Sequence, residues 1–183
     1  MAITRWMSWE GGVDLAAGTR PDLAVPNALV RVARVAHTPL GSAPAGLLVW
    51  QPDPHGHPAV AGFVCPDPAI GAWFGPNLFR GTPFEDAPAL PAVIEIDVRL
   101  PDAVAAKVTV GGHVFEVTLT DLGPAGAVNR PPGLMPFAQQ GVEARAGSAS
   151  LKVDGQAIAI HVPALGMSGA PGACWSPVGL YAR

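Results

Sequence analysis

The sequence predicts an all-β protein: a single-domain antiparallel β-barrel or β-sandwich over residues 1–183, built from hairpins. Two hairpins can be read with their register, one turning at Gly111-Gly112 and one at Asp154-Gly155, because such dipeptides form tight turns that match strand twist. About eight short alternating or β-branched segments are separated by Gly- and Pro-rich turns, and no convincing helix is expected. The choice between barrel and sandwich, and the strand order, stay open.

The hairpin around Gly111-Gly112 predicts its own pairing. A turn there places Val110 opposite His113 and Lys107 opposite Glu116. This register makes one face apolar and leaves the other polar except at Val114. The apolar face holds Ala106, Val108, Val110, Phe115, Val117 and Leu119. A shift by one residue would mix the two faces, so we expect this register.

Further strands are expected on both sides of this hairpin. They are predicted at 29–37, 46–51, 59–65 and 94–100, with a possible last edge strand within 166–183. The second readable hairpin, within 149–162, places Leu151 opposite Ile158. Residues 1–27 are expected to be largely irregular, and 137–145 to hold one helical turn or a poor strand.

Composition narrows the classes of function. Charged residues make up 14% of the chain, whereas about 25% is usual. The net charge of −3, without a basic cluster, argues against a nucleic-acid partner. No apolar run approaches the roughly 18 residues of a membrane helix, and the N-terminal residues lack a secretory pattern. We therefore expect a cytoplasmic protein without a membrane partner. Low charge also suggests a homo-oligomer.

The segment 66–90 is the predicted site. It shows no sustained periodicity and is expected to be a long loop, which in a compact domain is usually functional. Aromatic side chains among its glycines and prolines are expected to pack onto the sheet. Together with Trp50 from outside the segment and Arg80 within it, they form the predicted ligand-binding set: Trp50, Trp73, Phe74, Phe79, Arg80 and Phe84. Apolar walls with a few polar groups are typical of small-molecule sites.

Glu85, Asp86 and His113 are the candidate catalytic residues. The two carboxylates are adjacent and follow Phe84, and desolvation beside an aromatic ring raises a carboxyl pKa toward the range of general acid–base catalysis. His113 is expected on the apolar face of its hairpin, where an imidazole can act as an acid or base. A solvated turn residue is the simpler interpretation for each of the three.

No metal or cofactor is predicted. His55 and His57 form the single pair with metal-ligand character, but they lie in a Pro/Gly turn and no glutamate follows them, so a solvated turn is favoured. There is no phosphate-binding loop, dinucleotide fingerprint or nucleophile elbow. Cys65 and Cys174 lack C-x-x-C spacing, and their redox state stays open.

Two functions remain open. The first is a small-molecule-binding protein with its site at 66–90, with a slight preference for cofactor-independent acid–base catalysis of the lyase or isomerase type. The second is a non-catalytic structural or assembly subunit that uses the aromatic loop as a protein–protein interface. The sequence identifies neither the ligand nor a reaction.

Overall fold

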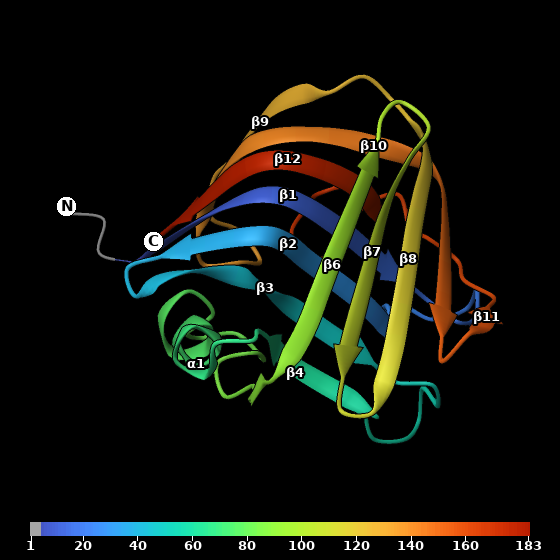
Figure 1. Ribbon diagram of the computed structural model, residues 1–183, viewed down its shortest axis with the longest axis horizontal. Helices are drawn as coiled ribbons and strands as arrows, with labels where there is room; N and C mark the ends of the chain where they lie inside the picture. Colours follow the sequence, from blue (N-terminus) through green and yellow to red (C-terminus); the bar gives the residue numbers. More distant parts are fainter. Residues whose placement is uncertain (1–4) are drawn as a thin grey trace.

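A computed structural model describes residues 5–183, which form one curled, open β-sheet and one helix (Figure 1). The prediction of an all-β fold is confirmed. In chain order the elements are β1 (Trp6–Ala17), β2 (Ala28–Thr38), β3 (Gly41–Trp50), β4 (Val60–Val64), α1 (Pro68–Asn77), β5 (Ala89–Leu90), β6 (Ala92–Arg99), β7 (Ala103–Val110), β8 (His113–Leu122), β9 (Gly126–Arg130), β10 (Ala138–Val153), β11 (Gln156–Ile158) and β12 (Ala173–Ala182).

The sheet curls until its two ends meet at one corner. Its main path runs β5-β4-β3-β2-β1-β12-β10-β8-β7-β6, with β9 and β11 paired to β10. β5 pairs with β4, and the chain then passes through Pro91 directly into β6, at the other end of the path. At this corner the N–H of Ala92 donates to the carbonyl of Cys65 at 3.3 Å. Elsewhere the curl stays open, and β6, β7 and β8 cross in front of β1, β2 and β3 (Figure 1).

The concave side of the curl holds the interior cluster, a core of apolar side chains from both layers. The register predicted for both readable hairpins is confirmed: Lys107 pairs with Glu116, and Leu151 with Ile158. All six residues of the predicted apolar face belong to the interior cluster. Burying this face against β1 and β2 is what holds the register, because a one-residue slip would expose it.

The first and last strands of the chain are central in the sheet, which corrects two predictions. Residues 6–17 were expected to be irregular but form β1, which lies between β2 and β12. Gly11, whose φ is +65°, is missing from the pairing with both neighbouring strands, and this irregularity interrupts the alternation of β1. β12 is likewise central rather than an edge strand, and 137–145 is largely the first half of β10.

The segment 66–90 is not a continuous loop, because residues 68–77 form helix α1. Asp67 caps it: the side-chain carboxylate accepts hydrogen bonds from the N–H groups of Ala69 (2.8 Å) and Ile70 (3.2 Å). Gly75 lets the helix approach the following turn, since a Cβ there would lie 2.2 Å from the carbonyl oxygen of Glu85. Gly71 and Gly75 are small residues within the helix, and they obscure its helical periodicity in the sequence. No helix among residues 5–183 is long and apolar enough to span a membrane.

The far end of β6 is less buried than its alternation predicts. Ile94 and Ile96 pack against the interior cluster, whereas Val98 is 37% exposed and Leu100 57% exposed. The interior cluster therefore does not extend to this end of β6.

Candidate functional site

A second apolar cluster lies on the convex side of the sheet, under α1 and the turns that follow it. We call it the outer-face cluster; its buried members are Trp9, Ala33, Ala36, Ala45, Leu47, Phe63, Cys65, Ile70, Phe74, Leu78, Phe79, Phe137 and Tyr181. Phe63 of β4 stands 5.5 Å from Phe74 and 5.1 Å from Phe79, measured between ring centroids. The aromatic segment therefore packs onto the sheet, as its composition predicts.

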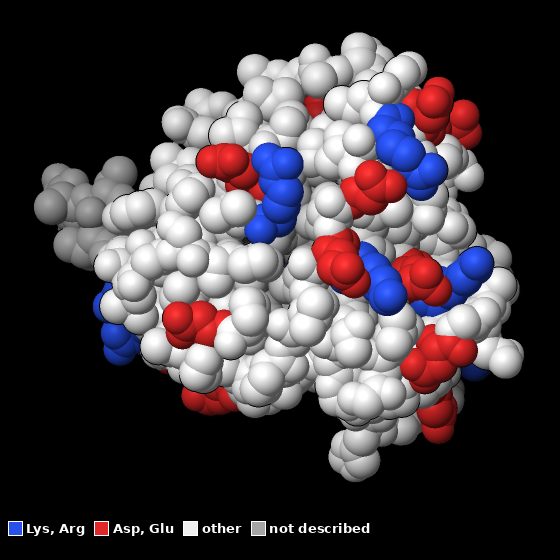
Figure 2. Space-filling model, in the orientation of Figure 1, with Lys and Arg blue, Asp and Glu red and all other residues white. Residues whose placement is uncertain are grey.

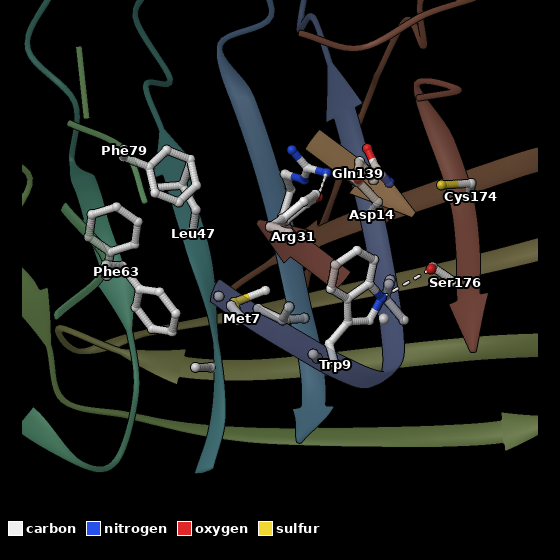
Figure 3. Close-up of a pocket in the computed structure, with 18 of the residues that line it drawn as sticks. Met7, Trp9, Asp14, Arg31, Leu47, Phe63, Phe79, Gln139, Cys174 and Ser176 are labelled. Carbon is white, nitrogen blue, oxygen red and sulfur yellow. Dashed lines mark hydrogen bonds and ion pairs between the residues drawn. The ribbon is translucent and has the colours of Figure 1, made fainter. Parts of the chain in front are cut away.

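A partly open cavity, the outer cavity, lies within this cluster (Figure 3). About 80 Å³ is available in it to the centres of water molecules, room for several waters or one small organic group. Its larger apolar walls are Met7, Trp9, Leu47, Phe63, Phe74 and Phe79. Its polar residues are Asp14, Arg31, Gln139, Glu143, Cys174, Ser176 and Tyr181. A smaller cavity of about 20 Å³ adjoins Asp14, Arg31 and Phe79 as well.

Asp14 and Arg31 form an ion pair at the polar end of the outer cavity. They are directly opposed in the β1–β2 register, and Arg31 Nη2 lies 2.8 Å from Asp14 Oδ2. The same nitrogen donates to the Tyr181 hydroxyl oxygen at 2.7 Å. Burial raises the pKa of the Asp14 carboxyl, although Arg31 opposes the shift. Burial also raises the pKa of Tyr181 to about 12, so its hydroxyl keeps its proton at neutral pH.

A second charged pair lies on β9 and β10. Arg130 donates to both carboxylate oxygens of Glu143, at 2.8 and 2.7 Å, the two-point geometry that an arginine offers a carboxylate. Glu143 is only 7% exposed. Its Oε1 also accepts from Gln139 Nε2 at 2.7 Å. The remaining polar atom of that amide, Gln139 Oε1, is buried and has no hydrogen-bond partner within the described part of the chain.

Trp9 forms one wall of the outer cavity and is fixed from two sides. Its Nε1 donates to Ser176 Oγ at 3.0 Å, and that hydroxyl donates to the Val142 carbonyl at 2.9 Å. Its ring lies over Gly179, where an added Cβ would come within 2.0 Å of the indole. Nearby Cys174 is buried, and burial strongly raises the pKa of its thiol. This disfavours the thiolate and hence nucleophilic chemistry there.

The predicted ligand-binding residues do not gather at one place. Phe74 and Phe79 line the outer cavity, and Phe79 and Phe84 line the smaller one. Trp73 is half-buried, 5.8 Å from Phe74 between ring centroids. Trp50 lies on the concave side, in the interior cluster. Arg80 is exposed, 3.9 Å from Glu85 across an ion pair.

The three predicted catalytic residues line neither cavity. Glu85 accepts from the N–H of Gly81 at 2.8 Å, with its side chain 38% exposed, and Asp86 is exposed. His113 Nδ1 lies 2.8 Å from Asp154 Oδ2, where two hairpin tips meet. Glu85 and His113 therefore each have a hydrogen-bonding partner near the surface, and neither lines the outer cavity.

The histidine pair of the turn before β4 is exposed. His55 and His57 both lie at the surface, and Asp53 in the same turn accepts from the N–H of His55 at 3.0 Å. Among residues 5–183 there is no group of three or more side chains placed to hold a metal ion.

The polar residues of the outer cavity were not singled out from the sequence. Asp14 stands between Val13 and Leu15, and Arg31 between Val30 and Val32. Alternation of this kind normally indicates a solvated face, and here α1 and its following turns cover that face instead. The useful signal was a pair of opposite charges on neighbouring strands, but β1 was not recognised as a strand.

The charged side chains elsewhere are scattered. In the view of Figure 2, acidic and basic residues lie as neighbours, and no broad patch of one sign is visible.

Comparisons with protein-family models, curated proteins and solved structures find no match for this chain. Its structure defines it as an all-β protein with a curled open sheet and a cavity on the convex face.

Proposed function

We propose that this protein binds a small, uncharged molecule in the outer cavity. The observation that carries the proposal is a partly open, largely apolar cavity with buried polar groups at one end, the usual make-up of a ligand site. Its three charged lining residues are already paired, Asp14 with Arg31, and Glu143 with Arg130, which lies outside the lining. A charged ligand would add an unpaired charge in a desolvated place, which is unfavourable.

The charged groups at the polar end support this proposal, because charged pairs at a buried position add little to the stability of the fold. Desolvating two ion pairs costs free energy that their attraction only partly returns, and apolar residues of similar size often serve as well. The interior cluster, built from apolar side chains, shows that the same sheet can be packed without charges. We therefore assign the outer polar groups to ligand recognition.

Acid–base catalysis is a second candidate, favoured by the raised pKa of Asp14. A carboxyl that holds its proton longer than usual, next to a cavity, is a candidate general acid. This moves the expected acid–base chemistry from Glu85 to Asp14. The alternative role of 66–90 as an interface draws less support, because Phe74 and Phe79 are buried within the protein.

Indole, an apolar ring with one N–H, is a suitable probe of the outer cavity. We expect indole to shift ¹H–¹⁵N resonances of β1, β2 and β12 residues that line it. Ala33→Leu should fill the space and weaken this binding, because Ala33 is buried in the cavity wall. Ala127→Leu adds the same atoms at an exposed position of β9 and should leave binding unchanged. Shifts confined to other surfaces, or equal binding by both variants, would refute the proposal.

A further inference from the structure

Building on the binding function proposed above, we infer that the ligand carries an N–H or O–H group that donates a hydrogen bond to Gln139 Oε1. The ligand class is then a neutral molecule with a small apolar body and one donor at its edge. Neither the fold nor the size of the outer cavity requires this donor. It follows from one buried amide and the groups around it.

The orientation of the Gln139 amide follows from its neighbour. Its Nε2 lies 2.7 Å from Glu143 Oε1, and Arg130 holds both oxygens of that carboxylate. A carboxylate only accepts hydrogen bonds, so the NH₂ group of the amide must face it. The reversed amide would place two acceptors against each other. The carbonyl oxygen of the amide therefore points away from Glu143.

That oxygen is an acceptor without a donor. Gln139 is 3% exposed, and its Oε1 has no partner among the residues that the structure describes. Roughly 90% or more of buried polar groups in proteins are satisfied, so an exception calls for an explanation. Gln139 lines the outer cavity, which supplies one: a bound molecule completes the hydrogen bond.

Two neighbouring donor groups are engaged elsewhere. Arg31 Nη2 contacts Asp14 and the Tyr181 hydroxyl, and the Trp9 N–H is used by Ser176. Figure 3 shows Gln139 beside Arg31 and Asp14. The apolar residues Phe63, Phe79 and Leu47 lie at the left of the same view. A ligand whose apolar body rests on those walls can direct its donor toward the amide.

Pyrrole and furan test this inference, because they are rings of nearly equal size and only pyrrole has an N–H donor. Each is titrated into the ¹⁵N-labelled protein and followed by the resonances of the cavity residues. We expect pyrrole to bind roughly two- to tenfold more tightly, the usual worth of one neutral hydrogen bond. The side-chain NH₂ resonances of Gln139 should shift with pyrrole and not with furan.

Two variants of neighbouring glutamines provide the matched comparison. Gln139→Leu removes the acceptor at similar size and should bring the pyrrole-to-furan ratio to about one. Gln140→Leu makes the same change at the adjacent, exposed position and should keep the wild-type ratio. If Gln139→Leu does not fold, N-methylpyrrole, which lacks the donor, replaces it as the comparison in the wild-type protein, and it should bind like furan.

The possible outcomes separate the inference from the function on which it rests. Equal binding of pyrrole and furan in the outer cavity would overturn the donor requirement and leave the binding function standing. A preference for pyrrole that persists in Gln139→Leu would also overturn it. If neither ring shifts any cavity resonance while indole also fails, the proposed function itself falls.

Discussion

The two faces of the same strands carry opposite kinds of packing. On the concave side, Val13 and Leu15 of β1 join a cluster of apolar side chains. On the convex side, Asp14 between them pairs with Arg31 beneath a cover of aromatic rings. Period-two alternation allows this division, since neighbouring residues point to opposite faces. The comparison shows that one face is packed with apolar side chains alone, while the other buries charged groups under an aromatic cover.

The largest effect is expected from the interior cluster. Phe115 is 1% exposed there and stands 6.5 Å from Trp50 between ring centroids. Phe115→Ala should cost about 3–5 kcal/mol of unfolding free energy, because a large buried ring leaves a cavity behind. Urea denaturation measures this loss. A cost below about 1 kcal/mol would show that the interior cluster is not the main source of stability.

Breaking the outer ion pair should have a smaller effect. Arg31→Met leaves the Asp14 carboxylate without its cation, with the two side chains 21% and 15% exposed. We expect a loss of about 1–3 kcal/mol, discounted for this partial exposure. Adding Asp14→Leu should restore much of it.

The surface pair of Arg99 and Asp97 is the control for that change. Both side chains are 65% exposed, so Arg99→Met should change stability by about 0.5 kcal/mol or less. Equal losses in Arg31→Met and Arg99→Met, measured by the same denaturation, would mean that the outer pair behaves as an ordinary surface contact.

The seating of Trp9 can be disturbed without altering a polar group. Gly179→Ala places a Cβ within 2.0 Å of the indole, and displacing the ring should cost about 1–2 kcal/mol and reshape the outer cavity. Gly126→Ala meets no atom within 4 Å and should be nearly neutral. Thermal unfolding and indole titration of both variants make the comparison. Unchanged indole binding in Gly179→Ala would contradict a role for Trp9 in the wall.

The smallest expected effect is a pH dependence. The pKa of Asp14 is raised above its ordinary value of 3.8. Between the ordinary pKa and the raised pKa, the folded protein therefore binds more protons than the unfolded chain. Stability from this group is therefore fully present below about pH 4 and lost as pH rises through the folded pKa. The melting temperature of the wild type relative to Asp14→Asn should fall as pH rises toward neutrality. A difference that grows with pH would reverse the sign of the shift.

Local patterns were sufficient for the hairpins and insufficient for the site. The Gly111-Gly112 and Asp154-Gly155 turns specify their registers through chemistry contained in the hairpin itself. β1 was missed because the irregular backbone at Gly11, with its positive φ, interrupts the alternation. Asp14, Arg31 and Gln139 meet only after distant strands pair, and Asp14 and Arg31 are covered by turns that follow α1; nothing local in the sequence encodes that arrangement. Helix α1 was missed because Gly71, Gly75 and Pro76 obscure its period, although the Asp67-Pro68 cap signal was present.

The open curl leaves β6 with one unpaired edge, since β7 is its single neighbour along the main path. Exposed backbone amides and carbonyls of this kind invite another strand to add on, the first step of fibril growth. β6 alternates Glu95, Asp97 and Arg99 along its exposed side, and charges on a strand edge oppose such stacking. Three side chains that contribute nothing to the core thereby protect the unpaired edge of an incompletely closed sheet.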